Sequence, residues 1–274
     1  MAKIITFTNQ KGGVGKTTTC AGVAGCLVRM GKKVLALDLD PQGNLSFSLG
    51  ADGDSSYTIY DVFKSRADIY DTVQHCDSCD VVPANILLSG VELELTSMGR
   101  EYILKKHLST IADDYDYILI DTPPALSILT INAYAASNQL VIPMVPEILS
   151  LQGISQLKET IFAVKKYYNP QLEIRGIVLN KYSPRLVLTK EVEELATKIA
   201  DMIDTDVFEQ KISGSVIIAE APAHAKTIVE YAPRSKSAHE YMDLTYEILG
   251  LEKPKRKVQK LGRGRPPKNK PIDL

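Results

Sequence analysis

The sequence predicts an α/β fold with a single doubly wound, mostly parallel sheet that is covered by helices on both faces. Three observations lead to this prediction. Short apolar runs alternate with amphipathic segments of helical length along most of the chain. A glycine-rich loop joins the first apolar run to an alanine-rich segment, and acidic residues follow two later runs. Open parallel sheets bind their ligands at the carboxyl ends of strands, so these features are expected to share one edge.

The glycine-rich loop reads N-Q-K-G-G-V-G-K-T-T from Asn9 to Thr18. It follows a buried strand expected at Lys3–Thr8, and a helix is expected to begin at Lys16. Backbone N–H groups of such a loop and the positive end of the helix dipole form an anion site, so phosphate is the natural ligand. Lys16 can reach the β- and γ-phosphates of a nucleotide, and the Thr17 hydroxyl can coordinate Mg²⁺. The fold is therefore expected to be of the P-loop NTPase type.

The loop departs from the usual pattern because Gln10 stands where the first glycine is expected and Lys11 opens the glycine run. This K-G-G-V-G-K-T-T resembles the deviant Walker A box of the ParA/MinD family of dimerising ATPases. The resemblance implies ATP and Mg²⁺ as cofactors and a homodimer with ATP at its interface, where the matching lysine, Lys11, contacts the partner's nucleotide. It places these residues around the nucleotide: Gly12, Gly13, Val14, Gly15, Lys16, Thr17 and Thr18.

Two further strands end in carboxylates. The run Val34–Leu37 leads into D-L-D-P-Q-G-N, and the run Tyr117–Ile120 leads into D-T-P-P. These stretches are similar to the family's Walker A′ and Walker B motifs. The resemblance implies that Asp40 orients the attacking water, that Asp121 holds Mg²⁺ and that Asp38 supports the Mg²⁺ shell or the loop. The implied catalytic set is Lys11, Lys16 and Asp40, and the implied metal set is Thr17, Asp38 and Asp121.

Residues 1–252 are predicted to form one ATPase domain, and its remaining segments are expected to be further helices and strands. The sequence identifies no functional residue in the segment 50–80. Asn180 follows a predicted strand at a position that contacts adenine in part of the family. Apolar runs predict strands at Gln139–Val145 and Ile174–Leu179. Helices are predicted at Ile59–Lys64, Arg100–Ala112, Leu151–Asn169, after an N-cap at Thr189, and at Ala238–Leu249.

Charge is distributed unevenly between the folded part and residues 253–274. This tail has nine Lys/Arg against Asp273, about +8, and since the whole chain carries −1 the rest carries about −9. Its Lys, Arg, Gly and Pro content predicts disorder and a polyanionic partner. The stretch G-R-G-R-P-P-K looks like an AT-hook for the narrow minor groove of A·T-rich DNA, and a generic basic tail is the alternative. The hook's DNA-binding residues are Arg263, Gly264, Arg265 and Lys268.

Among branches of the family, the sequence favours a Soj-like partition ATPase that binds DNA nonspecifically as an ATP-dimer. A ParB-like centromere-binding partner is expected to stimulate hydrolysis and release. The tail has too few apolar residues for a MinD-type membrane helix, and no cysteine after Cys79 could hold an iron–sulfur cluster. We therefore expect a cytoplasmic protein that is nucleoid-associated when ATP-bound and does not bind membranes. A MinD-like positioning ATPase, or a ParA-like regulatory ATPase acting on another cargo, is the alternative.

Overall fold

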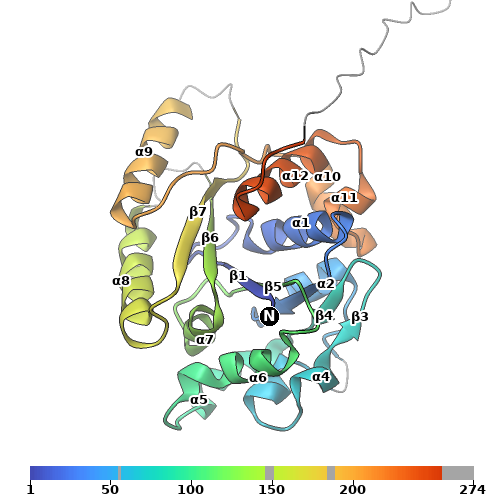
Figure 1. Cartoon of the computed structure of the whole chain (residues 1–274), viewed down its shortest axis with the longest axis vertical. Coiled ribbons are helices and arrows are strands. Elements are labelled where there is room, and N and C mark those ends of the chain that lie inside the picture. The colour runs from blue at the N-terminus through green and yellow to red at the C-terminus, as the bar shows by residue number, and fades with distance from the viewer. Residues whose placement is uncertain (55–56, 146–150, 184–188, 255–274) are drawn as a thin grey trace, which may run out of the picture.

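A seven-stranded sheet forms the centre of the computed structural model, which describes residues 1–54, 57–145, 151–183 and 189–254 (Figure 1). The strand order is β3-β4-β2-β5-β1-β6-β7. Every neighbouring pair is parallel except β3 and β4, so the predicted doubly wound, mostly parallel sheet is confirmed. The strands are β1 Lys3–Phe7, β2 Val34–Asp38, β3 Gln74–His75, β4 Asp80–Val82, β5 Tyr117–Asp121, β6 Gln139–Met144 and β7 Glu173–Leu179.

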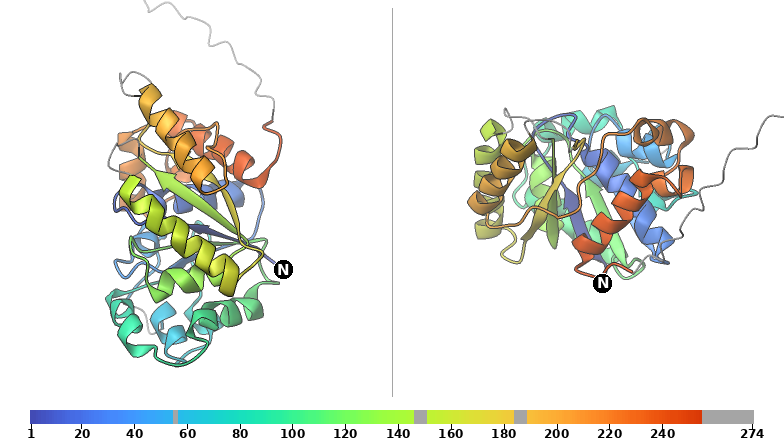
Figure 2. Two further views of the ribbon diagram at one scale, coloured as in Figure 1. Left: turned by 90° about the vertical axis from the view of Figure 1, so that its left-hand side faces the viewer. Right: turned by 90° about the horizontal axis from the view of Figure 1, so that it is seen from above.

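Helices cover both faces of this sheet, and Figure 2 shows α1 and α12 on one side with α8 and α9 on the other. The helices are α1 Lys16–Arg29, α2 Asn44–Leu49, α3 Ile59–Phe63, α4 Ile69–Thr72, α5 Val91–Glu94, α6 Ile103–Ile111, α7 Ile128–Ala136, α8 Leu151–Tyr167, α9 Thr189–Met202, α10 Val216–Glu220, α11 Ile228–Tyr231 and α12 Lys236–Leu249. Short 3-10 turns occur at Ile86–Gly90, Arg100–Tyr102 and Ala221–His224.

Alternating side chains of the strands divide the core into two layers. On β5, Ile118 and Ile120 belong to the layer under α6, α7 and α8, whereas Leu119 belongs to the layer under α1 and α12. All three side chains are fully buried. Continuous apolar strands of this kind are typical of parallel sheets that are covered on both faces.

The register of the central strands aligns the three motifs. Phe7 at the end of β1 lies beside Asp121 at the end of β5, and Asp121 lies beside Asp38 at the end of β2. The Leu39 N–H also donates to the Asp121 carbonyl oxygen at 3.0 Å. The phosphate loop and both acidic motifs therefore meet at one edge of the sheet, as their positions after the ends of strands predicted.

Several element boundaries differ from the predicted ones. The helix expected from Arg100 begins with a 3-10 turn and becomes α-helical only at Ile103. The last helix begins two residues early, because the Ser235 hydroxyl oxygen accepts the Ala238 N–H at 3.1 Å as an N-cap. Strand β3 and its antiparallel pairing with β4 were not predicted.

The described residues contain no helix that is long and apolar enough to cross a membrane. The AT-hook-like residues Arg263, Gly264, Arg265 and Lys268 lie outside the described residues. The predictions about this hook therefore remain sequence-based.

Candidate active site

The phosphate loop leaves the carboxyl end of β1, which lies between β5 and β6, and leads directly into α1. Gly13 has φ +71°, and Gly15, the N-cap of α1, has φ +87° and ψ 31°. These left-handed conformations favour glycine because a Cβ would strain the backbone. A Cβ on Gly15 would in addition lie 2.7 Å from the Asn180 Nδ2 atom. The glycines at 13 and 15 are thus required by local geometry.

Lys16 extends back across the loop from the first turn of α1. Its Nζ atom donates to the Lys11 carbonyl oxygen at 3.3 Å, and the residue is only 6% exposed. Burial lowers the pKa of Lys16, while the nearby carboxylates of Asp121 and Asp40 oppose that shift. The structure therefore brings the predicted phosphate-binding lysine beside both acidic motifs.

Thr17 and Asp121 form the part of the site that fits a divalent cation. The Thr17 Oγ1 hydroxyl donates to Asp121 Oδ2 at 2.5 Å, and Asp121 Oδ1 is buried without a hydrogen-bond partner among the described residues. Burial, followed by the charge of Asp38, raises the pKa of Asp121 well above its usual range. A buried oxygen without a partner is costly, and hard cations such as Mg²⁺ prefer carboxylate and hydroxyl oxygens. The donor set therefore fits the predicted Mg²⁺.

Asp38 organises the turn between β2 and α2. Its Oδ1 accepts the Asp40 N–H at 3.0 Å, and its Oδ2 accepts the Ser46 N–H and hydroxyl at 2.8 Å each. Complete burial raises the pKa of Asp38 to about 6, against the effect of these hydrogen bonds. Because both oxygens already have protein donors, the structure connects Asp38 more closely with loop support than with direct metal contact.

Asp40 lies at the start of the same turn. Its Oδ1 accepts the Gln42 N–H at 3.0 Å, and the residue is 8% exposed. Its negative charge raises the pKa of Lys16, against the larger effect of burial. The structure thus places the predicted water-orienting carboxylate beside the phosphate loop, and its catalytic role remains a prediction.

The segment that carries Lys11 is anchored to the neighbouring strand. The Lys11 N–H donates to Asn9 Oδ1 at 3.0 Å, and Asn9 Nδ2 donates to the Pro143 carbonyl oxygen on β6 at 2.8 Å. Lys11 itself is partly exposed. Its predicted contact with a partner's nucleotide concerns a second chain and stays a prediction.

A pocket of about 360 Å³ adjoins the phosphate loop. Asn180, predicted to contact adenine, is one of its walls; its Nδ2 donates to the Val14 carbonyl oxygen at 2.9 Å and to Thr19 Oγ1 at 3.0 Å. Asn180 Oδ1 is buried without a partner among the described residues. The walls are formed by Gly15, Thr18, Asn180, Lys181, Ile212, Ser213, Gly214, Ser215, Ile218, Ala219, Pro222 and Tyr241.

Sequence reasoning missed one residue of this site, Lys181. Its Nζ atom donates to the Gly13 carbonyl oxygen at 3.1 Å, and its backbone has φ +52°. No motif among those identified in the sequence includes this position. The only available signal was that a basic residue follows Asn180 directly after a predicted strand.

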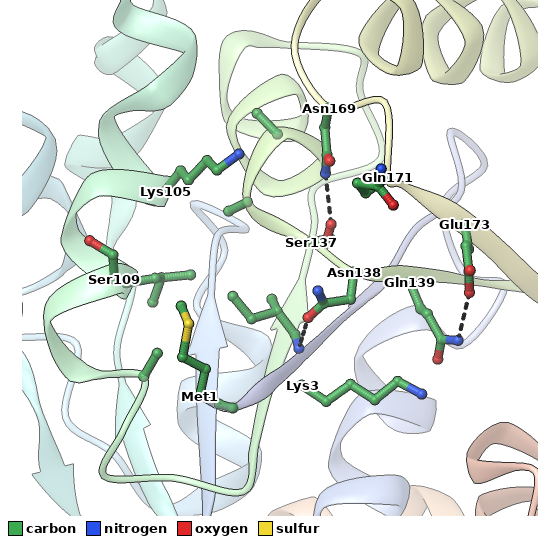
Figure 3. Close-up of a pocket in the computed structure, with 16 residues that line it drawn as sticks. Met1, Lys3, Lys105, Ser109, Ser137, Asn138, Gln139, Asn169, Gln171 and Glu173 are labelled. Atoms are coloured by element: carbon green, nitrogen blue, oxygen red, sulfur yellow. Dashed lines mark hydrogen bonds between the residues drawn. The ribbon is translucent and has the colours of Figure 1, made fainter.

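A larger cavity of about 670 Å³ lies at the opposite, amino-terminal edge of the sheet (Figure 3). Lys3, Gln139 and Glu173 begin β1, β6 and β7 there, and Gln139 Nε2 donates to Glu173 Oε2 at 3.1 Å. Lys105 of α6 reaches the cavity from the other side. Because the phosphate loop follows the carboxyl end of β1, this cavity is separate from the candidate active site.

Comparison with known proteins identifies relatives along almost the whole chain. A family model described as an AAA domain matches residues 2–174. The chain is 42% identical to the sporulation initiation inhibitor protein Soj of Bacillus subtilis, over 90% of this chain and 98% of that protein. It is 37% identical to the chromosome partitioning protein ParA of Myxococcus xanthus, over 93% of this chain and 90% of that protein.

Solved structures show the same fold. The cobyrinic acid a,c-diamide synthase from Mycobacterium smegmatis with a bound ATP analogue and magnesium has a TM-score of 0.79 and 32% identity, covering 91% of this chain and 95% of that chain. The septum site-determining protein MinD from Pyrococcus horikoshii, complexed with Mg-ADP, has a TM-score of 0.73 and 28% identity, covering 90% and 96%.

Proposed function

Because the chain belongs to the ParA/MinD family of deviant Walker A ATPases, it binds and hydrolyses ATP with Mg²⁺, and we propose that it uses this activity to partition DNA. The observation that carries the partition assignment is the 42% identity to Soj over 98% of that protein's length. The chromosome partitioning protein ParA of Caulobacter vibrioides, 36% identical over 95% of its length, supports the same assignment.

Lys16, Thr17 and Asp121 are the residues proposed to hold the nucleotide and its metal ion. Mg²⁺ supplies positive charge that offsets the charge developing on the phosphates. Thr17 Oγ1 and Asp121 are the oxygen donors suited to hold it, because they already lie 2.5 Å apart and Asp121 keeps a second oxygen without a partner among the described residues. Lys16 is buried beside them and supplies a cation for the phosphates.

Asp40 is proposed to orient the attacking water. The hydrogen bonds from Asp40 N–H to Asp38 and from Gln42 N–H to Asp40 fix its backbone and one carboxylate oxygen. Such preorganisation lowers the cost of positioning a nucleophile. Asp38 therefore contributes by holding Asp40 and the start of α2 in place.

Lys11 is proposed to join two chains around their nucleotides. A lysine that contacts the partner's phosphates favours the dimer only when the γ-phosphate is present, which would make dimerisation depend on ATP rather than ADP. Dimerisation would then double the number of basic tails on each particle. Residues 253–274 carry about +8, whereas the rest of the chain carries about −9. Because DNA is a polyanion, these tails are proposed to make the contact with DNA.

A DNA-retention assay tests this function. Mg·ATP should retain the wild type on duplex DNA and Mg·ADP should not. Asp40→Ala should bind ATP and stay on DNA because it cannot complete hydrolysis, whereas Lys16→Ala should fail to bind ATP. A centromere-binding partner should release the wild type but not Asp40→Ala. Equal retention with ATP, with ADP and by Lys16→Ala would contradict the proposal.

A MinD-like positioning role, or a regulatory role on another cargo, remains the alternative. The similarity to the MinD structure is lower in identity than that to the partition proteins. If the ATP-bound protein failed to bind DNA but bound vesicles of anionic lipid, the MinD-like function would replace the proposed one.

A further inference from the structure

Two consecutive residues after β7 bond to successive peptide groups of the phosphate loop. Lys181 Nζ donates to the Gly13 carbonyl oxygen at 3.1 Å, and Asn180 Nδ2 donates to the Val14 carbonyl oxygen at 2.9 Å. The same amide lies 3.5 Å from the Gly15 carbonyl oxygen. These contacts join segments more than 160 residues apart in the sequence.

The backbone at Lys181 is held in an unfavourable conformation by its neighbours. Its φ of +52° is in the left-handed region, which non-glycine residues adopt at a cost. On one side the Asn180 N–H donates to the Met144 carbonyl oxygen at 2.7 Å, and on the other the Tyr182 N–H donates to the Ile212 carbonyl oxygen at 3.0 Å. Ser65, Asp204 and Ala225 have similar positive φ values outside this site, so the strain at Lys181 supports a functional role only together with its contact to Gly13.

The peptide geometry of the phosphate loop indicates what the Lys181 contact does. In a trans peptide the C=O and the N–H point in opposite directions. A donor on the Gly13 carbonyl therefore turns the Val14 N–H to the other side, and a donor on the Val14 carbonyl does the same for the Gly15 N–H. Phosphate-binding loops use N–H groups turned inward in this way. A cation on the carbonyl also polarises the peptide and strengthens its N–H as a donor.

We propose that Lys181 is a positioning residue for the nucleotide, and that with Asn180 it forms a clamp holding the loop's N–H groups toward the phosphates before nucleotide arrives. The proposal rests on the ATPase activity within the proposed function and does not depend on DNA. Because the N–H groups contact phosphate in the ground state and the transition state alike, losing the clamp should weaken binding and leave kcat nearly unchanged.

Three variants separate the clamp from other roles of Lys181. Lys181→Met keeps the apolar stem and removes the ammonium group, and Lys181→Arg restores a cation. Lys105→Met is the matched control, since Lys105 lies at the opposite edge of the sheet. We expect Lys181→Met to weaken Mg·ADP binding about fivefold by titration calorimetry, the effect of an exposed charge-assisted hydrogen bond. Lys181→Arg should bind within about twofold of the wild type, and Lys105→Met should match it.

Hydrogen exchange of the nucleotide-free protein distinguishes a clamp from direct contact with nucleotide. A clamp protects the loop before ligand binds, so peptides covering residues 9–18 should exchange faster in Lys181→Met than in the wild type or Lys105→Met. Lys181→Gly adds a second control because it removes both the contact and the backbone strain. It should weaken Mg·ADP binding as much as Lys181→Met without lowering the Tm.

The proposal is overturned if Lys181→Met binds Mg·ADP as tightly as the wild type, if its kcat falls while KM is unchanged, or if loop exchange is unaltered. It is also overturned if Lys181→Arg is as weak as Lys181→Met. If the wild type bound Mg·ADP but not DNA, the partition function would be contradicted. The clamp would still be tested by these measurements, because none of them involves DNA.

Discussion

Gly15→Ala should destabilise the nucleotide-free protein by about 3–4 kcal/mol, for two reasons that the structure separates. Alanine at φ +87° costs about 1–2 kcal/mol of backbone strain. Its Cβ would lie 2.7 Å from Asn180 Nδ2, so the Asn180 side chain must move. That movement breaks its hydrogen bonds to Val14 and Thr19, at about 1 kcal/mol each.

Two neighbouring glycines provide matched controls. Gly13 has φ +71° but no atom within 4 Å of an added Cβ, so Gly13→Ala should cost only the strain, about 1–2 kcal/mol. Gly12 has neither a positive φ nor a close neighbour, and Gly12→Ala should stay within about 0.5 kcal/mol of the wild type. Urea unfolding followed by circular dichroism measures all three free energies of unfolding.

A further change tests the clash itself. With Asn180→Ala as the background, Gly15→Ala should cost only the strain, because the side chain that the Cβ displaces is gone. The reasoning is refuted if Gly15→Ala is no more destabilising than Gly13→Ala, or if its cost is the same with and without Asn180.

Three other predictions concern different parts of the chain. Lys11→Ala should remain monomeric with Mg·ATP by light scattering while the wild type doubles in mass; a wild type of equal mass with ATP and ADP would contradict the ATP-dependent dimer. Burial raises the pKa of Cys26 to about 12, so at pH 8 iodoacetamide should modify Cys26 only after unfolding, and rapid labelling of the native protein would contradict its burial. Arg263→Ala/Arg265→Ala should weaken ATP-dependent DNA retention more on A·T-rich than on G·C-rich duplexes, since R-G-R fits a narrow minor groove; equal losses on both would leave a generic basic tail.

The sequence predicted the parts of the fold that depend on local patterns. Apolar runs of strand length located β1, β2, β5, β6 and β7, each within about two residues of the observed bounds. The carboxylates after two of these runs were expected at one edge of the sheet, and the register of Phe7, Asp121 and Asp38 confirms that they meet there. These features were predictable because the carboxyl ends of parallel strands lie at the same edge of a sheet.

Contacts between distant segments could not be predicted in the same way. Nothing in the sequence near Asp38 shows that Ser46 satisfies one of its oxygens, because that bond depends on how α2 packs. The Lys181 contact with Gly13 also depends on a left-handed backbone, which propensity gives no reason to expect for lysine. Strand β3 was missed because a strand of two residues carries too little periodicity.

The hydrogen bonds of the site also show which contacts within the protein must be broken when nucleotide binds. Lys16 bonds to the Lys11 carbonyl, and Thr17 bonds to Asp121, so the side chains expected to hold Mg·ATP are bonded within the protein. These bonds keep the buried ammonium and carboxylate groups from being left without partners, which would be costly. Binding therefore replaces existing partners, and the net gain is smaller than the sum of the new contacts. For that reason, the N–H groups held in place by Asn180 and Lys181 matter for affinity: they need no rearrangement, whereas Lys16 and Thr17 do.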